Sequence, residues 1–249
     1  MRRLATVTLL SAAAVVGGCT SLMPPAVTPR PGGGDPRAVY ASVRRNAAAV
    51  TSLRARFSAE MRRGEEQRAA EGVLLVKKPD RFRIRLLSAF GFTIFDYTTD
   101  DAHAHMALPL EGKEFSDADI AVHASFSPAE MRDLFLRDDP GEERCIAKAR
   151  GAETLVQCTD PDGALERQLF IQSDTETLTR EIAFTDGHPR VVMEFAEYRS
   201  VSGVRLPFHI ALTYPQRNVS LQIAARAYEV NPVLPDDLFD GAGAAAVSR

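Results

Sequence analysis

Apolar and polar side chains alternate with a period of two through most of this chain. The longest example places apolar residues at every second position from 204 to 212: Val204, Leu206, Phe208, Ile210 and Leu212. Successive side chains of a strand point to opposite faces, so the pattern predicts strands with one buried and one solvated face. A chain dominated by such segments forms an antiparallel sheet whose apolar face must be covered.

Turn-forming residues divide this pattern into short segments. Gly64-Glu65, Pro79-Asp80 and Asp186-Gly187 are examples of the dipeptides that separate one segment from the next. The predicted strands cover residues 52–62, 68–77, 81–87, 92–99, 102–108, 144–150, 153–159, 165–173, 179–186, 190–199, 203–214 and 217–229. Allowing for one false assignment, about eleven strands joined by short turns form an antiparallel meander, and a sheet this large must curl.

Two helices are predicted to cover the sheet. Asp35-Pro36 has the residue types of a helix start, and the apolar stripe Val39, Val43, Ala47 and Val50 follows it. The second begins with the capping box Ser127-Pro128-Ala129-Glu130 and continues with Met131, Leu134 and Phe135 on one face. The expected fold class is therefore mainly β (α+β): one strongly curved antiparallel sheet, an open or half barrel, with helices on its concave side.

The first nineteen residues combine a short basic start, an apolar run and a small-residue end at a cysteine. After Arg2-Arg3, the apolar run Leu4–Val16 would span only about 20 Å as a helix, less than the roughly 30 Å hydrocarbon core of a bilayer. It ends at Val16-Gly17-Gly18-Cys19, which is similar to a lipobox. The resemblance implies that residues 1–18 are a lipoprotein signal peptide and that Cys19 carries the lipid. The alternative is an ordinary signal peptide with an incidental cysteine.

The remaining chain divides into a tether, one domain and a tail. Residues 19–35 contain four prolines and the run Gly32–Gly34 without hydrophobic periodicity, and they are predicted to be a tether. Residues 36–240 carry the strand and helix patterns and are predicted to form one domain. Residues 241–249 are predicted to be a disordered tail.

The segment Asp80–Gly91 resembles the third strand and following loop of LolB-type lipoproteins, members of the LolA/LolB-like carrier superfamily. That family shows an Asp-Arg-aromatic strand and then an exposed loop in which an apolar residue precedes a glycine, as Phe90 precedes Gly91 here. The resemblance implies a lipid-anchored, periplasm-facing outer-membrane receptor that accepts acylated lipoproteins from a LolA-like carrier and inserts them into the membrane. The alternative is a lipid-anchored binding or envelope-assembly factor of the same fold that holds another apolar ligand.

Such a receptor needs an apolar cavity, because each acyl CH₂ exposed to water costs about 0.8 kcal/mol. The candidate lining residues are Phe82, Ile84, Leu86, Met131, Leu134, Phe135, Phe208 and Ile210. The alternative for each is an ordinary core position. In the family, the loop residue before the glycine reaches the membrane, so Phe90, Gly91 and Phe92 are the candidate membrane-insertion loop. The alternative for Phe90 is a buried loop aromatic.

Charge and motif content argue against other functions. The net charge of −3 gives no bulk attraction to nucleic acid. No GxSxG, GxxxxGK[ST], HExxH or GxGxxG motif occurs, so we expect a protein that is not an enzyme and needs no cofactor. We also expect it to be a monomer. His103 and His105 could hold a metal with Asp100 or Asp101, although a solvated strand face is the better interpretation, and no metal site is predicted.

Alternate residues Arg81, Arg83 and Arg85 predict a basic stripe on the outward face of the sheet. This stripe could pair with acidic side chains on neighbouring strands. It could also contact anionic lipid or an acidic carrier.

Cys145 and Cys158 are predicted to form a disulfide. Export places the domain in an oxidising compartment, and Cys19 is taken by lipid, which leaves one pair. Gly151-Ala152 has the residue choice of a type II′ hairpin, and pairing Arg150 with Glu153 sets the two cysteines directly opposite each other. They then form a non-hydrogen-bonded pair, whose Cα separation of roughly 4.5 Å suits a disulfide. The alternative is two reduced cysteines in a slipped register.

Overall fold

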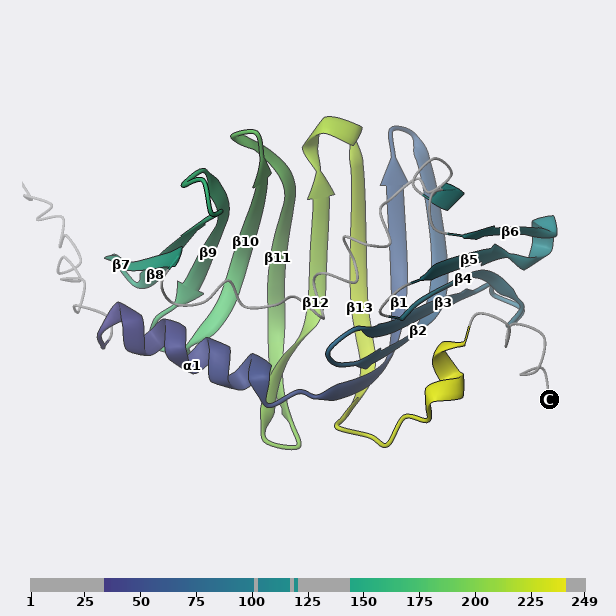
Figure 1. Cartoon of the computed structure of the whole chain (residues 1–249), viewed down its shortest axis with the longest axis horizontal. Helices are drawn as coiled ribbons and strands as arrows, with labels where there is room; N and C mark the ends of the chain where they lie inside the picture. The colour runs from purple at the N-terminus through teal and green to yellow at the C-terminus, as the bar shows by residue number, and fades with distance from the viewer. Residues whose placement is uncertain (1–33, 101–102, 117–118, 121–143, 241–249) are drawn as a thin grey trace, which may run out of the picture. The chain divides into compact units, whose positions relative to one another are not determined.

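Thirteen antiparallel strands form a single open sheet in the computed structural model, which describes residues 34–100, 103–116, 119–120 and 144–240 (Figure 1). The strands are β1 (Ser52–Arg63), β2 (Glu66–Lys77), β3 (Arg81–Leu87), β4 (Thr93–Thr99), β5 (Ala104–Leu108), β6 (Lys113–Ser116), β7 (Cys145–Arg150), β8 (Glu153–Thr159), β9 (Leu165–Gln172), β10 (Thr177–Thr185), β11 (His188–Val201), β12 (Val204–Tyr214) and β13 (Val219–Val230). Helix α1 (Pro36–Ala48) precedes them. The 3₁₀ turns are η1 (Pro109–Glu111), η3 (Pro215–Arg217) and η4 (Asp236–Phe239).

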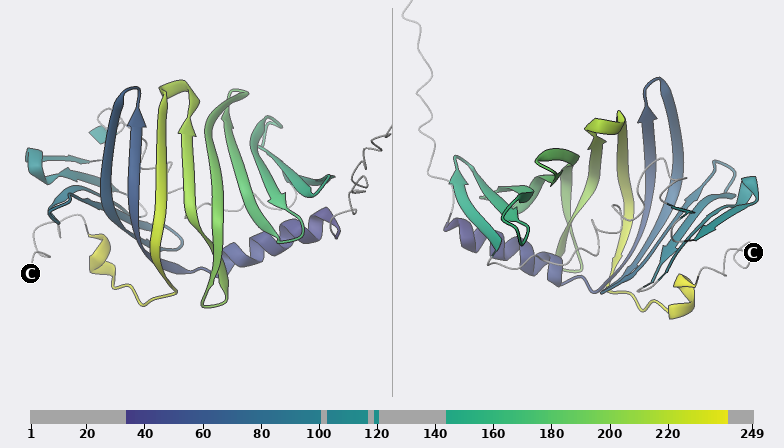
Figure 2. Two further views of the ribbon diagram at one scale, coloured as in Figure 1. Left: turned by 180° about the vertical axis from the view of Figure 1, so that it is seen from behind. Right: turned by 45° about the horizontal axis from the view of Figure 1, so that its top comes forward.

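The strand order is β6-β5-β4-β3-β2-β1-β13-β12-β11-β10-β9-β8-β7. Strands that follow each other in the chain therefore lie side by side, except that β1 pairs with β13 at the centre and β6 and β7 lie at opposite edges. Figure 2 shows that the sheet curls instead of lying flat. The predicted fold class, an open curved antiparallel sheet with few helices, is confirmed.

Each of the twelve segments considered as strands contains a strand, so the allowance for one false assignment was unnecessary. The predicted count of about eleven is too low, because the sheet has thirteen strands. The additional strand is β6, Lys113–Ser116, which has one apolar residue, Phe115. Four residues with a single apolar side chain show no alternation, and β6 is a strand because its backbone pairs with β5.

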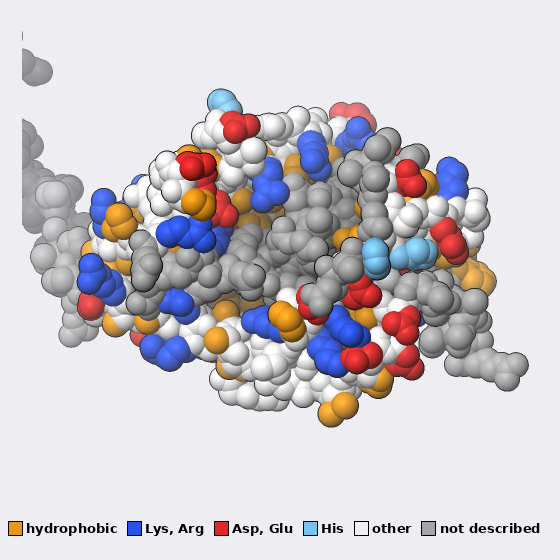
Figure 3. Space-filling model, viewed as in Figure 1, with side chains coloured by type: hydrophobic (Ala, Val, Ile, Leu, Met, Phe, Trp, Pro, Cys, Tyr) orange, Lys and Arg blue, Asp and Glu red, His pale blue; other side chains and the backbone are white. Residues whose placement is uncertain are grey.

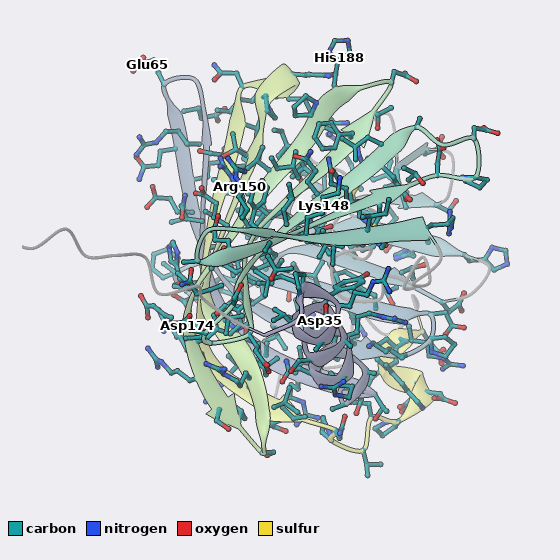
Figure 4. The ribbon with its side chains drawn as sticks, turned by 90° about the vertical axis from the view of Figure 1, so that its left-hand side faces the viewer. Asp35, Glu65, Lys148, Arg150, Asp174 and His188 are labelled. Atoms are coloured by element: carbon teal, nitrogen blue, oxygen red, sulfur yellow. A yellow bond between two sulfur atoms is a disulfide. The ribbon has the colours of Figure 1, made fainter. Side chains whose placement is uncertain are left out.

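Helix α1 begins where the sequence predicts. The Asp35 carboxylate accepts a hydrogen bond from the backbone N–H of Arg37, and Pro36 occupies the first turn. Val39 and Tyr40 are buried against β7 and β8, together with Val156, Leu169 and Ile171. Figure 4 looks at this edge of the sheet and shows α1 nearly end-on, with Asp35 at its start. The second predicted helix, residues 127–136, lies outside the described residues.

A larger apolar cluster extends over the rest of the inner face. Its fully buried members include Phe82, Tyr97, Met106, Met193 and Leu212, which come from both sides of the central β1–β13 pair. They occupy alternate positions of their strands, as the period-two pattern predicts.

No helix in the described part of the chain is long and apolar enough to cross a membrane.

Arg83 of the predicted basic stripe is buried and paired, and it does not face solvent. Its guanidinium is buried, donates two hydrogen bonds to Asp96 on β4 at 2.8 and 2.7 Å, and donates a third to the backbone oxygen of Leu238 at 2.7 Å. Arg85 also pairs with Asp96 at 3.0 Å, so the predicted pairing with a neighbouring strand is correct. The C-terminal turn η4 packs over this part of β3 and buries Phe239, which the alternation could not indicate.

Candidate functional site

An apolar groove of about 580 Å³ lies on the inner face of the β1–β6 half of the sheet. A volume of this size is typical of small-molecule sites, which are mostly apolar with few polar groups. Alternate residues of β1, β3 and β13 point into the groove. The lining residues are Phe57, Ala59, Met61, Arg68, Ala69, Ala70, Ile84, Leu86, Ile94, Phe95, Met106, Leu108, Leu110, Glu111, Lys113, Phe115, Leu221 and Ile223.

A glycine makes room for one aromatic wall of the groove. Gly72 on β2 lies opposite Phe57 on β1, and a Cβ built on Gly72 would meet the Phe57 Cζ at 2.2 Å. Any larger side chain at position 72 must therefore push the Phe57 ring away from its place. Because Phe57 lines the groove, the shape of the groove depends on this glycine.

The β3–β4 turn projects two phenylalanines into solvent beside the groove. The N–H of Ser88 donates to Phe92 O at 2.8 Å, the N–H of Gly91 donates to Ser88 O at 2.9 Å, and Gly91 has a φ of 83° that favours glycine. Phe90 at the tip is 87% exposed and Phe92 is 63% exposed. The alternative of a buried loop aromatic is therefore wrong for Phe90.

Charged side chains at the groove are paired with each other. Arg68 bonds to Glu66 on the same strand, and Lys113 bonds to Glu111 at 2.7 Å. In the view of Figure 3, Lys and Arg side chains are interspersed with Asp and Glu along the rim of the molecule. The charged residues that line the groove, Arg68, Glu111 and Lys113, therefore include both signs.

A second, smaller pocket of about 220 Å³ lies between α1 and strands β10–β13. Two tyrosines line it: Tyr198 donates a hydrogen bond to Leu178 O at 2.6 Å, and Tyr228 donates one to Pro207 O at 2.8 Å. Burial raises the pKa of Tyr198 far above its usual value and raises the pKa of Tyr228 to about 12. Both phenols are therefore neutral hydrogen-bond donors at physiological pH.

The structure divides the predicted cavity residues among different environments. Ile84 and Leu86 line the groove, whereas Phe82 is fully buried and packs edge-to-face on Tyr97. Ile210 lines the second pocket. Phe208 lies outside both pockets and packs against the Tyr228 ring and under the Arg199 guanidinium. Of the predicted lining residues in the described part of the chain, Ile84 and Leu86 line the groove and Phe82, Phe208 and Ile210 do not.

Other predicted site residues lie outside the described part of the chain. These are Cys19, Met131, Leu134 and Phe135. The predicted lining residues did not include Phe57, Ala59 and Met61, which line the groove from β1. Their spacing at every second position of the strand could have indicated that they share one face.

Cys145 and Cys158 lie directly opposite each other and their sulfur atoms are joined, with the Cα atoms 4.1 Å apart. The register is the one predicted from the hairpin, in which Gly151 has a φ of 63°. The Tyr40 hydroxyl of α1 lies 3.5 Å from the Cys145 sulfur. The disulfide therefore secures the edge hairpin on which α1 rests.

The two histidines considered for a metal lie on or beside β5. His105 Nε2 lies 3.7 Å from a carboxylate oxygen of Glu114 on β6, and the backbone N–H of His103 donates to Asp100. Among the described residues, no three His, Cys, Asp or Glu side chains gather in a way that could hold a metal ion.

Solved structures share this architecture at low sequence identity. A DUF1329 family protein from Desulfovibrio piger matches with a TM-score of 0.62 at 15% identity, over 83% of this chain and 98% of the other. A putative outer membrane lipoprotein-sorting protein domain from Vibrio parahaemolyticus matches at 0.59 and 11% identity, over 83% and 97%. A LolA superfamily protein from Nitrosomonas europaea matches at 0.58 and 9% identity, over 80% and 96%.

The chain therefore shares its fold, a large open antiparallel sheet, with these proteins. No family model matches the sequence, and no curated protein matches it. At these identities the likeness concerns the fold alone, so the role of the groove must be argued from its own residues.

Proposed function

We propose that this protein is a lipid-anchored, LolB-like receptor that takes the acyl chains of lipoproteins into the groove and delivers them to the outer membrane. The observation that carries the proposal is the apolar groove of about 580 Å³ on the inner face of β1–β6. An acyl chain in transit needs such a surface, because each CH₂ left in water costs about 0.8 kcal/mol. The role is non-catalytic and needs no cofactor.

The exposed Phe90 loop supports the delivery step. Leu86 and Ile94, which line the groove, lie close to the two ends of this loop. An acyl chain leaving the groove beside a membrane-inserted Phe90 would avoid water. A charge at the tip resists entering the bilayer, so Phe90→Glu should bind acyl chains normally and lose delivery into liposomes.

Anchoring through Cys19 is the third part of the proposal. Several acyl chains on one cysteine give stable membrane attachment, whereas one chain is marginal. Cys19→Ala should abolish incorporation of labelled palmitate and leave a folded, mislocalised domain. Labelled palmitate on the Cys19→Ala variant would contradict the lipobox interpretation.

Photo-crosslinking tests the central claim. A photoreactive amino acid at Met61, within the groove, should trap an acylated lipoprotein that is presented by a LolA-like carrier. The same amino acid at Val233, which is exposed outside the groove, is the matched control and should trap none. The non-acylated form of the lipoprotein should not be trapped from either position.

The alternative function has a distinct outcome in the same experiment. A lipid-anchored binding or assembly factor would trap another apolar ligand at position 61 and no lipoprotein. Depletion would then leave other lipoproteins correctly sorted, whereas loss of a receptor would strand them in the periplasm.

A further inference from the structure

The β5–β6 turn carries an exposed leucine at the same end of the sheet as the Phe90 loop. Leu110 in η1 is 68% exposed and lines the groove. The β4–β5 register pairs Asp96 with Ala107 near the end of β5, so η1, which begins at Pro109, lies beside the N-terminal part of β4. Turn η1 also contacts β4 directly.

Exposed apolar side chains are concentrated at this end. Among the described residues, five large hydrophobic side chains are exposed, and three of them are Phe90, Phe92 and Leu110. The other two are Ile146, on strand β7 at the opposite edge of the sheet, and Val233, in the C-terminal segment. Three large apolar side chains at two neighbouring turns form a surface that water solvates poorly.

We propose that Phe90, Phe92 and Leu110 form a two-turn membrane-docking surface that inserts into a phospholipid bilayer and sets the groove opening against it. This proposal rests on the proposed function and extends it, because the second turn would fix the orientation that a single loop leaves free. Two insertion points on adjacent hairpins restrict rotation of the sheet about either one.

The charges beside these turns indicate which lipids the surface requires. Lys113 bonds to Glu111 and Arg68 bonds to Glu66, so the basic groups nearest the groove are already paired with carboxylates. Attraction to anionic lipid needs unpaired basic residues near the bilayer surface. Docking is therefore driven by the apolar side chains and is independent of anionic headgroups and of salt.

Vesicle partitioning tests this proposal. The chain is produced from Thr20 onward without lipid, which retains every described contact because the described residues begin at Gly34. Leu110→Glu and Phe92→Glu should each lower partitioning onto phosphatidylcholine vesicles by about tenfold or more, since each removes a large inserted apolar group. Ile146→Glu and Val233→Glu are the matched controls and should leave partitioning unchanged, as should added phosphatidylglycerol.

The proposal is overturned if the Leu110→Glu variant partitions like the unchanged protein, or if vesicle binding requires phosphatidylglycerol. Leu110→Ser is a milder change that serves as a second variant in case Leu110→Glu misfolds. It should also lower partitioning onto vesicles, but by less than Leu110→Glu. If Leu110→Glu blocks transfer from a carrier protein and keeps vesicle binding, the surface contacts protein and the proposal is wrong.

A parallel measurement separates this proposal from the proposed function. A fluorescent fatty acid is titrated into the same protein without vesicles. If the unchanged protein binds vesicles as expected but binds no fatty acid, the receptor function is contradicted and the docking surface stands. If the protein binds fatty acid but the Leu110→Glu variant binds vesicles as well as the unchanged protein does, only the docking surface is contradicted.

Discussion

The two ends of the sheet use the same alternating strands for different purposes. At the β7–β9 end, α1 covers the inner face with Val39 and Tyr40, and a disulfide joins the edge hairpin. At the β1–β6 end, the inner face is hollowed into the apolar groove, and two turns beside it expose phenylalanine and leucine. Helix cover and a cross-link therefore stabilise one end, while the other end leaves apolar surface open in the groove.

The largest effect is expected in the core of the β1–β6 half. Phe82→Ala should lower the free energy of unfolding by about 3–5 kcal/mol, because it removes a fully buried ring that packs on Tyr97. Leu86→Ala, at a half-buried position in the groove, should cost clearly less and weaken acyl binding instead. Urea denaturation with a fatty-acid titration measures both. Equal losses of stability in the two variants would mean that Leu86 is an ordinary core residue and not part of a binding groove.

The disulfide should matter next. Replacing Cys145 and Cys158 together by serine should lower the free energy of unfolding by up to about 3 kcal/mol, because the bridge restricts the unfolded chain. Hydrogen exchange should increase in α1, which rests on this hairpin, and remain unchanged in β2 and β3. Two free thiols in the exported protein under non-reducing mass spectrometry would contradict the bridge itself.

Alkaline pH should destabilise the α1 side through Tyr228. Its folded pKa of about 12 lies above the ordinary value of 10.0, so the unfolded state releases its proton first as pH rises. Stability is then fully present below pH 10 and falls between pH 10 and 12, by about 2 kcal/mol from this group. Tyr228→Phe should flatten the decline measured by urea denaturation at pH 9, 10 and 11. An equal decline in the variant would assign the effect to other groups.

The smallest effect concerns the attachment of the C-terminal part of α1. The Asn46 side chain donates to Arg205 O and accepts from Arg205 N–H, both at 2.9 Å. Asn46→Ala should cost about 1 kcal/mol and loosen the helix over the second pocket. Asn46 lies outside the groove, so fatty-acid binding there should be unchanged. A loss of binding would show that the two ends are coupled.

Local pattern was sufficient for most of the secondary structure. Turn residues and alternation indicated twelve strand segments, counted as about eleven strands, together with the Asp35-Pro36 helix start and the register that sets Cys145 opposite Cys158. These features depend on residues that are neighbours in the chain or in one hairpin. Of the strands in the described part of the chain, β6 was missed, because Lys113–Ser116 is too short to show a period.

Tertiary structure decided what each inward position does. Alternation assigns Phe82 and Leu86 to the same face, but only the packed sheet buries Phe82 fully and leaves Leu86 in the groove. The β1–β13 pairing and the burial of Arg83 beneath η4 join segments more than 150 positions apart in the chain. Most strands and the faces of the sheet therefore follow from the sequence alone, because they depend on backbone geometry over a few residues. The depth of each side chain, and hence the groove, came from long-range packing that no local pattern encodes.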